Sequence, residues 1–272
     1  METIAHYRIL ERVGESGLGE IFRARDTKLG RTVALTVPPG GIQDDLSRRE
    51  LLLSDAKQAM TVSHPNLAAL YEAGEDGGRV YLAFEFVPGD TLDRVIAGHP
   101  LNVRRAIDLT SQIADALAEA HAAELPHGDV TARKVVVTPK GNAKLLDFGF
   151  SRWTRADAAA SGEEGDIAAV GVLFFEMLTG RAPSAVGAAP SAVNKSLPSE
   201  VDAIASKPHQ SAVAFAADLR SLGALLQTRA EAAEKSRPTA MRSAPRRSTA
   251  PWIAAIGMIL AAAAAVAWWW TR

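Results

Sequence analysis

The 272-residue sequence contains no cysteine. Disulfide bonds and thiolate metal sites are therefore excluded, and the composition suits a reducing cytoplasm. The chain also lacks a large net charge of either sign, because 30 basic residues nearly balance 31 acidic ones, so overall charge predicts no nucleic-acid partner. The N-terminal stretch METIAHYRIL has no long apolar run behind a basic start, and we expect no signal peptide. The sequence contains no internal repeat.

One long segment near the C-terminus carries no charged residue. Residues 252–270 read WIAAIGMILAAAAAVAWWW. As a helix, about 19 residues rise ~28 Å, close to the ~30 Å hydrocarbon core of a bilayer. A buried alanine-rich helix is the alternative, but tryptophans at both ends are typical of the aromatic belts at membrane interfaces. We therefore expect a transmembrane helix.

The residues around this segment indicate its orientation. Residues 229–251 are rich in proline, serine, alanine and charge without apolar periodicity, which predicts a flexible basic linker. By the positive-inside rule, the arginines ahead of the apolar segment predict that the N-terminal part stays in the cytoplasm. These arginines are Arg242, Arg246 and Arg247. Only Thr271 and Arg272 follow, so we expect a single-pass tail anchor in the cell membrane.

The first 228 residues carry strand patterns first and helix patterns later. Short strand-like runs fill residues 7–37 and 67–87, and a helical pattern at 44–63 lies between them. A long amphipathic helix is predicted from its N-cap Asn102, an apolar helix at 166–180, and a last helix from near Ser211. Without strict alternation of strand and helix, this order predicts an α+β domain of two lobes.

An ordered series of motifs runs through these elements. They are VGESGLGEIFRARD, VALTV, SHPNLAALYEAGE, VYLAFEFVPGDTL, HGDVTARKVVVTPKGNAKLLDFGFSR, DIAAVGVLFFEMLTGR and FAADLRSL. From about Tyr7 to Leu226 the chain resembles the bacterial Ser/Thr protein kinases of the eukaryotic-like type. The resemblance implies a bilobal protein-kinase fold over residues 1–228, with an N-lobe to about residue 87. Small-molecule phosphotransferases related to aminoglycoside kinases share the fold core and the HGD triplet, but SHPN, VPGDTL and EMLTGR fit the protein kinases better.

The resemblance implies a nucleotide cleft between the lobes. In the glycine loop, Ser16 replaces the second glycine of G-x-G-x-x-G. Phe84 takes the gatekeeper position at the start of the hinge, whose backbone would hydrogen-bond adenine. The implied nucleotide-binding residues are Gly14, Gly17, Gly19, Ile21, Ala34, Thr36, Glu85, Val87 and Val136. Alternatively, the apolar members of this set only pack the core.

The N-lobe residues that handle phosphate depart from the family. The third strand reads V-A-L-T, so Thr36 replaces the lysine that holds the α- and β-phosphates. Counting back from the SHPN motif places Asp55 where the family has the glutamate that pairs with this lysine. Threonine has neither the charge nor the reach of lysine, so the ion pair cannot form. Arg23, on the strand after the glycine loop, is one substitute cation that the sequence offers.

The catalytic loop departs from the family as well. Asp129 stands at the position of the base for the substrate hydroxyl, and Asp147 of the intact DFG triplet could take a metal. Thr131 replaces the lysine expected beside the γ-phosphate, and Lys134 replaces the asparagine that ligates a second magnesium. We expect Lys134 to face Asp147 as a tethered cation in the place of magnesium. The alternatives are a lysine that points to solvent, and aspartates that only satisfy local backbone donors.

The activation segment of the resembled family is incomplete in this sequence. Only 19 positions lead from Asp147 to Asp166, and no A-P-E triplet occurs among them. Asp166 is placed to tie down the catalytic loop, while Gly128 replaces the arginine that meets a phosphorylated activation segment. The substrate-docking part of a kinase is therefore reduced.

Together these features favour a membrane-anchored, protein-kinase-like signalling or scaffolding module with impaired catalysis, a pseudokinase. ATP is expected to bind weakly if it binds, and a requirement for magnesium is doubted. The membrane and unidentified proteins are the expected partners, and nucleic acid is not. The competing hypothesis is an active Ser/Thr kinase that transfers the γ-phosphate of ATP to protein hydroxyls with displaced catalytic groups.

Overall fold

The computed structural model describes residues 2–154, 162–185 and 187–235. Residues 1–225 form one compact unit, and a second unit starts at Leu226. The described part of the second unit is the end of a helix that reaches Lys235. This helix continues through residues 229–235, which the composition had assigned to the linker. The predicted transmembrane segment, residues 252–270, lies outside the described residues.

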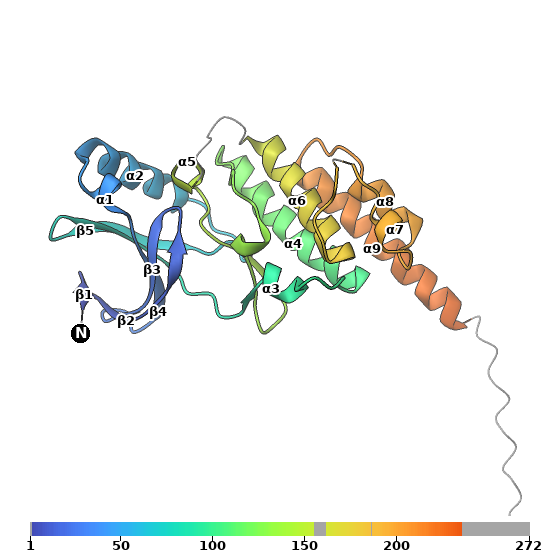
Figure 1. Cartoon of the computed structure of the whole chain (residues 1–272), viewed down its shortest axis with the longest axis horizontal. Coiled ribbons are helices and arrows are strands. Elements are labelled where there is room, and N and C mark those ends of the chain that lie inside the picture. Colours follow the sequence, from blue (N-terminus) through green and yellow to red (C-terminus); the bar gives the residue numbers. More distant parts are fainter. Residues whose placement is uncertain (1, 155–161, 186, 236–272) are drawn as a thin grey trace, which may run out of the picture. The chain divides into compact units, whose positions relative to one another are not determined.

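The N-terminal part of the first unit is a six-stranded antiparallel sheet with the strand order β1-β2-β3-β4-β6-β5 (Figure 1). The strands are β1 (Thr3–Ile4), β2 (Tyr7–Ser16), β3 (Gly19–Asp26), β4 (Thr32–Val37), β5 (Leu70–Asp76) and β6 (Arg79–Glu85). Between β4 and β5 the chain forms the helices α1 (Gly40–Gln43) and α2 (Leu46–Ala59). This order confirms the predicted N-lobe of strands with one long helix.

The alternation of side chains along β4 divides the sheet into two faces. Val33, Leu35 and Val37 belong to an apolar core that also contains Tyr7 and Tyr81. The residues between them point to the opposite face, where Thr36 pairs with Ile21 and Ala34 pairs with Phe84. The implied nucleotide-binding residues of β3 and β4 therefore share one face of the sheet.

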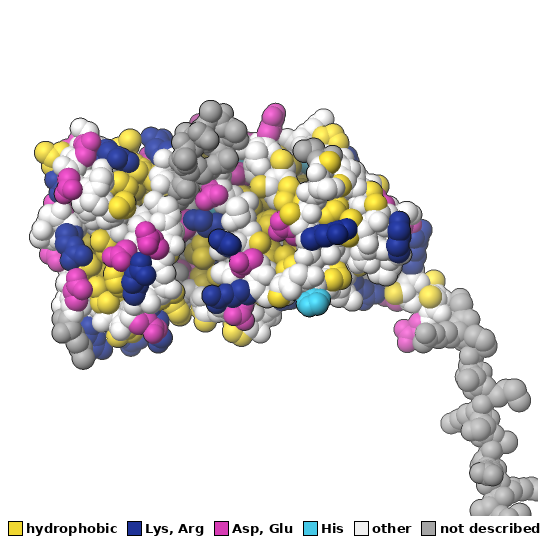
Figure 2. Space-filling model, in the orientation of Figure 1, with side chains coloured by type: hydrophobic (Ala, Val, Ile, Leu, Met, Phe, Trp, Pro, Cys, Tyr) yellow, Lys and Arg dark blue, Asp and Glu magenta, His cyan; other side chains and the backbone are white. Residues whose placement is uncertain are grey.

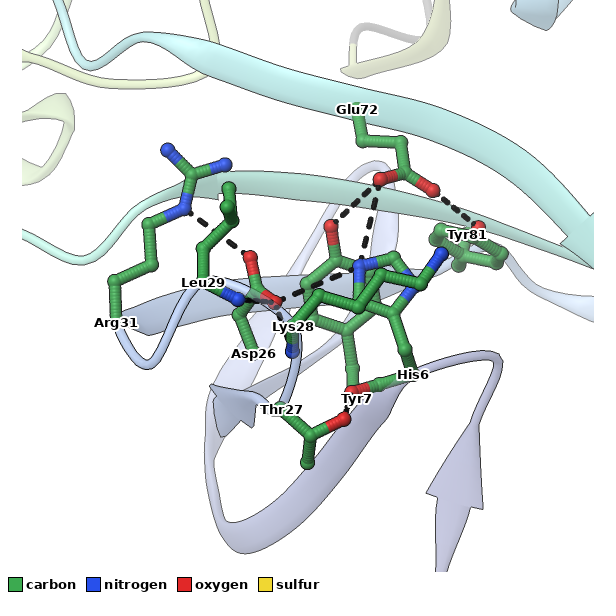
Figure 3. A network of polar contacts seen from close by, with 9 residues as sticks. All are labelled: His6, Tyr7, Asp26, Thr27, Lys28, Leu29, Arg31, Glu72 and Tyr81. Atoms are coloured by element: carbon green, nitrogen blue, oxygen red, sulfur yellow. Dashed lines mark hydrogen bonds and ion pairs between the residues drawn. The ribbon is translucent and has the colours of Figure 1, made fainter.

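A polar network ties together the strands on the core side of the sheet (Figure 3). The hydroxyl groups of Tyr7 and Tyr81 both donate to Glu72, at 3.0 and 2.6 Å. Burial raises the pKa of both tyrosines above the ordinary value, and the contacts with Glu72 raise it further. Nearby, the fully buried Asp26 accepts hydrogen bonds from the backbone amides of Lys28 and Leu29. The ring of His6 lies 3.6 Å from the carboxylates of Asp26 and Glu72. The network links β2, β3, β5 and β6.

The rest of the first unit is mostly helical and includes a small sheet, β7-β8-β9 (Figure 1). Its strands are β7 (Asp90–Thr91), β8 (Val135–Val137) and β9 (Ala143–Leu145). Its helices are α3 (Leu92–Ile96), α4 (Val103–Ala122), the 3-10 turn η1 (Ala132–Lys134), α5 (Ser151–Thr154), α6 (Glu163–Thr179), α7 (Pro190–Val193), α8 (Ser199–Ala205) and the part of α9 (Ala212–Lys235) that precedes Leu226. The side chain of Asn102 accepts a hydrogen bond from the Arg104 amide, which confirms the predicted N-cap of α4.

Two helices differ from their sequence predictions. The helix expected at 44–63 is shorter, because Asp45 caps α2 by accepting from the amides of Ser47 and Arg48. Leu46, the first residue of α2, is 67% exposed. Helix α6, expected to be apolar nearly all round, begins at Glu163 and leaves Val172 39% exposed.

The surface of the described residues shows mixed charge. On the face drawn in Figure 2, basic and acidic side chains are interspersed and hydrophobic side chains lie between them. Within the described ranges, no helix is both long enough and apolar enough to cross a membrane.

Candidate functional site

A buried carboxylate from α6 holds the catalytic loop. The Asp166 side chain is 1% exposed and accepts hydrogen bonds from the amides of His127 and Gly128, both at 2.7 Å. The ring of His121, on α4, lies 2.9 Å from the same carboxylate. Three partners compensate the burial of this charge. The expectation that Asp166 ties down the loop is confirmed.

His127 connects the catalytic loop to the segment that carries Asp147. Its Nδ1 accepts a hydrogen bond from the Asp129 amide at 3.2 Å, and its Nε2 donates to the Leu146 carbonyl at 2.8 Å. Only a neutral ring protonated at Nε2 can make both contacts. Burial lowers the pKa of His127, in agreement with a neutral ring. One buried imidazole thus links the backbone at Asp129 to the backbone just before Asp147.

Lys134 lies between these two aspartates. It ends the turn η1, and its Nζ is in direct contact with the Asp147 carboxylate. The same Nζ is 3.9 Å from an oxygen of Asp129. All three side chains are mostly buried, with exposures of 14% for Lys134, 13% for Asp147 and 25% for Asp129. The expectation that Lys134 faces Asp147 is confirmed, and the alternative that it points to solvent is wrong.

Asp55, which the resemblance placed as the partner of a phosphate-binding lysine, has other partners in the structure. Thr36 is 2% exposed and carries no charge. Asp55, on α2, instead accepts a hydrogen bond from the indole Nε1 of Trp153 at 2.7 Å and lies 3.3 Å from Nε of Arg152. Both partners belong to α5, directly after the DFG triplet. Sequence reasoning missed this contact, because α5 is one turn long and shows no periodicity.

Arg23 does not take the place of the missing lysine. Its Nη1 is 2.7 Å from Glu11, and its guanidinium lies 5.6 Å from the centroid of the Phe86 ring in the hinge. In the sheet it stands opposite Ala34 and not opposite Thr36. Arg23 is therefore engaged by Glu11 and lies near the predicted hinge.

The glycine turn packs closely against the end of β4. Gly19 has a φ of 125°, and a Cβ there would lie 2.1 Å from the Val37 carbonyl oxygen, so only glycine fits. Leu18, at the tip of the turn, is fully buried, and its amide donates to the Ser16 hydroxyl at 3.2 Å. Gly14 lies within β2, and Gly17 is exposed in the turn.

The predicted gatekeeper and hinge residues are packed or paired with residues from other elements. Phe84 is 5% exposed and packs edge-on against Phe150, with ring centroids 5.7 Å apart. Glu85, at the end of β6, pairs with Lys144 at 2.5 Å. Val87 follows the strand and is half-buried, and no described residue bonds to its amide. Ile21 and Ala34 are half-buried, and Val136 on β8 is 6% exposed.

The donor set does not fit magnesium. Magnesium prefers several oxygen ligands in octahedral geometry. Here Asp147 is already paired with a lysine ammonium, which also approaches Asp129. A lysine of the chain itself therefore lies where a metal would bind these carboxylates.

Comparisons with known proteins agree with this fold. A family profile described as "Protein kinase domain" matches residues 7–161. The serine/threonine-protein kinase PrkC of Bacillus subtilis is 30% identical over 199 residues, which cover 65% of this chain and 31% of PrkC. The serine/threonine-protein kinase pkn3 of Myxococcus xanthus is 30% identical over 222 residues, which cover 68% of this chain and 41% of pkn3. The chain thus spans less than half the length of these relatives.

A solved structure shows the same architecture. The crystal structure of the Mycobacterium tuberculosis PknI kinase domain superposes with a TM-score of 0.65 at 22% sequence identity, covering 81% of this chain and 97% of that chain. At this identity the likeness concerns the fold alone. With the profile match over more than half of its residues, the chain belongs to the protein kinase family.

Proposed function

We propose that this chain is a catalytically impaired protein-kinase module, a pseudokinase that acts in signalling by binding or scaffolding other proteins. One observation carries the proposal: the Lys134 ammonium contacts Asp147 and approaches Asp129 to 3.9 Å. These are the two carboxylates that a protein kinase uses for metal binding and for orienting the substrate hydroxyl. In this chain an internal cation occupies the space between them.

The chemistry of phosphoryl transfer explains why a lysine between these two carboxylates impairs catalysis. The protein contributes mainly positioning and charge neutralisation, so each missing cation or ligand affects the rate directly. Losing one positioned catalytic group commonly costs about 10²–10⁴ in rate. Thr36, Thr131 and Lys134 each replace such a group. The effects are not additive, but we expect two of these losses together to bring transfer near the background rate.

The framework around the site is nevertheless intact. Asp166 and His127 hold the catalytic loop by buried hydrogen bonds, as a kinase core requires. The fold therefore persists without the residues that handle ATP, and a stable fold with a reduced active site is suited to binding. The partners of this module are proteins of unidentified kind.

An active Ser/Thr kinase is the second candidate. The retained Asp129 and DFG triplet favour it, as do relatives named as serine/threonine-protein kinases. Such an enzyme would transfer the γ-phosphate of ATP to protein hydroxyls. A small-molecule phosphotransferase is a lesser candidate and is supported by the HGD triplet alone.

We also propose that residues 252–270 anchor the protein in the cell membrane with the kinase-like domain in the cytoplasm. The uncharged run bordered by tryptophans and preceded by arginines supports this placement.

A phosphate-transfer assay tests the proposed function. The purified full chain is incubated with ATP labelled at the γ-phosphate, with magnesium or manganese, alone and with a generic protein substrate. No incorporation above an ATP-only blank is expected. Incorporation that disappears in an Asp129→Asn variant, but persists in the exposed-site control Asp108→Asn, would show an active kinase and overturn the proposal.

A further inference from the structure

Two arginines stand directly opposite one another on neighbouring strands of the N-lobe sheet. Arg8 on β2 is the cross-strand partner of Arg25 on β3. Both are exposed, whereas Tyr7, Ala24 and Asp26, beside them in sequence, are fully buried. Because side chains alternate along a strand, the two arginine side chains lie on the face of the sheet that is opposite to its apolar core.

Neither of these two guanidinium groups is bound by a described residue. Every other arginine between residues 2 and 87 has a hydrogen bond or an ion pair; these are Arg12, Arg23, Arg31, Arg48, Arg49 and Arg79. Arg8 and Arg25 have no such contact within the described part of the chain. Like charges directly opposite one another destabilise a sheet. The two arginines without a partner therefore also repel one another, and an external anion would relieve this repulsion.

The carboxylates nearest to the two arginines in sequence are engaged elsewhere. Glu11 pairs with Arg23 at 2.7 Å, and Glu2 pairs with Arg79 at 3.1 Å. Asp26 is fully buried on the core side of the sheet and accepts hydrogen bonds from backbone amides. The positive charge on the exposed face is therefore left for a ligand.

Two threonines extend the arginine pair into a row across four strands. Thr3 on β1 is the cross-strand partner of Arg8, and Thr32 on β4 is that of Arg25 (Figure 1). Among the described residues, neither threonine hydroxyl has a hydrogen-bond partner. Neighbouring strands lie about 4.8 Å apart, so the two guanidinium groups can hold one small anion between them, with a hydroxyl donor beyond each.

The charge of the pair selects the kind of anion. A guanidinium group binds phosphate oxygens through two parallel N–H···O hydrogen bonds. A phosphate monoester carries about −1.5 to −2 charges at pH 7 and has three free oxygens, so it matches two guanidinium groups in charge and in acceptors. A carboxylate, or the phosphodiester of a lipid headgroup, carries only a single negative charge. The row therefore favours a phosphate monoester.

We infer that Arg8 and Arg25 bind the phosphate group of a phosphorylated side chain on a partner protein. The inference rests on the proposed function, because it names the kind of partner that the binding module takes. Clusters of arginines are a recurring means of recognising phosphorylated side chains. None of the four residues of the row belongs to the implied nucleotide-binding or catalytic set, so this surface is distinct from the candidate site.

A fluorescence-anisotropy titration of the purified full chain in neutral detergent tests the inference. The probe is a dye-labelled peptide of alanine and glycine with one phosphoserine, compared at low ionic strength with versions that carry serine or glutamate. The phosphopeptide should bind about tenfold or more tightly than either version. Equal binding of the phosphopeptide and the serine peptide overturns the inference.

A competition experiment distinguishes a phosphoprotein from a lipid surface. O-phosphoserine should displace the labelled phosphopeptide at a concentration about tenfold or more lower than glycerophosphoglycerol, the soluble headgroup of an anionic lipid. Equal displacement by the two compounds would show a site for lipid headgroups and overturn the inference.

Two matched variants locate the binding. Arg25→Gln removes one guanidinium group of the pair and should weaken phosphopeptide binding by about tenfold or more. Arg79→Gln, on β6, removes the same charge from an arginine that Glu2 already engages, and it should leave binding unchanged. An equal loss in both variants would show only a general effect of charge and overturn the inference.

Thermal unfolding without a ligand separates a binding role of Arg25 from a structural one. Arg25→Gln should unfold at the same temperature as wild type or at a higher one, because it relieves the repulsion between like charges. Unfolding at a lower temperature would show that Arg25 serves the fold, and it would overturn the inference. These measurements do not depend on the phosphate-transfer assay, so the phosphoprotein partner and the pseudokinase proposal can fail separately.

Discussion

The indole N–H of Trp153 donates a 2.7 Å hydrogen bond to the buried carboxylate of Asp55. Arg152 approaches the same carboxylate, and the guanidinium of Arg48 lies 5.7 Å from the Trp153 ring. Gly149, in the DFG triplet, also meets α2, since a Cβ there would lie 2.8 Å from the Cβ of Ala59. Asp55 stands where a protein kinase has the acid that pairs with its phosphate-binding lysine. Here it instead attaches the start of the activation segment to α2.

We predict that breaking this contact destabilises the protein. Asp55→Ala leaves a mostly buried indole N–H unpaired and should lower the free energy of unfolding by about 1–3 kcal/mol. Urea unfolding of the full chain in detergent measures the change, with the exposed Asp44→Ala as the control. A double-mutant cycle with Trp153→Phe should give a coupling energy of about 0.5 kcal/mol or more. Strictly additive effects of the two substitutions would show that the contact contributes nothing.

The second prediction concerns Asp26 in the polar network of Figure 3. Burial raises the pKa of Asp26, but the amides of Leu29 and Lys28 and the guanidinium of Arg31 outweigh burial and hold it below its ordinary value of 3.8. A carboxyl group whose pKa is lowered in the folded state stabilises the fold fully above pH 3.8, and this stabilisation is lost as the pH falls from 3.8 through the lower pKa of the folded state. The network should therefore weaken in acid.

Asp26→Asn tests this dependence. At pH 7 the free energy of unfolding of the variant should be about 1–3 kcal/mol lower than that of wild type. The reason is that the amide group cannot accept a hydrogen bond from every donor that the carboxylate satisfies. As the pH falls below 3.8 and through the lowered pKa of Asp26, the difference should shrink, because the wild-type side chain then becomes neutral as well. Asp108→Asn, on the exposed side of α4, should match wild type throughout. A loss of unfolding free energy that has the same size at every pH would contradict the lowered pKa of Asp26.

The third prediction concerns the membrane. The full chain should sediment with membranes, because residues 252–270 are long enough and apolar enough to span a bilayer as a helix. A chain that ends before Pro251 should appear in the supernatant as a folded protein, as judged by gel filtration and circular dichroism. If the shortened chain stays with the membranes without aggregating, the anchor lies elsewhere.

The sequence predicts the features that depend on local pattern and motif order. Asn102 caps α4 as expected, and Asp166 holds the catalytic loop. The position of Lys134 opposite Asp147 followed from the spacing of the resembled family and is found in the structure. These features depend on neighbours in sequence or on a known fold.

Features that depend on side-chain contacts between distant elements could not be predicted. The partner of Asp55 lies 98 positions away in a one-turn helix, and nothing in the pattern around Trp153 marks it. Arg23 pairs with Glu11 because an irregularity in β2, between Ile9 and Glu11, shifts the register by one residue. A simple alternation of strand faces does not anticipate such a shift.

The most direct measurement is the thermal unfolding of Lys134→Asn in EDTA and in magnesium. Removing the ammonium leaves Asp129 and Asp147 facing each other, so in EDTA the variant should lose about 1–3 kcal/mol, more than a surface ion pair contributes. Asparagine is an oxygen ligand, so millimolar magnesium should restore the loss.

Two reference proteins complete the measurement. Arg133→Asn, at the neighbouring residue with 86% of its side chain exposed, should behave as wild type. Wild type itself should show no change in unfolding temperature with magnesium, because Lys134 occupies the space between the carboxylates. The predicted result is that magnesium restores the thermal stability of Lys134→Asn and leaves that of wild type unchanged. A wild-type protein that magnesium stabilises, or a Lys134→Asn variant equal to wild type in both conditions, would contradict the replacement of the metal by this lysine.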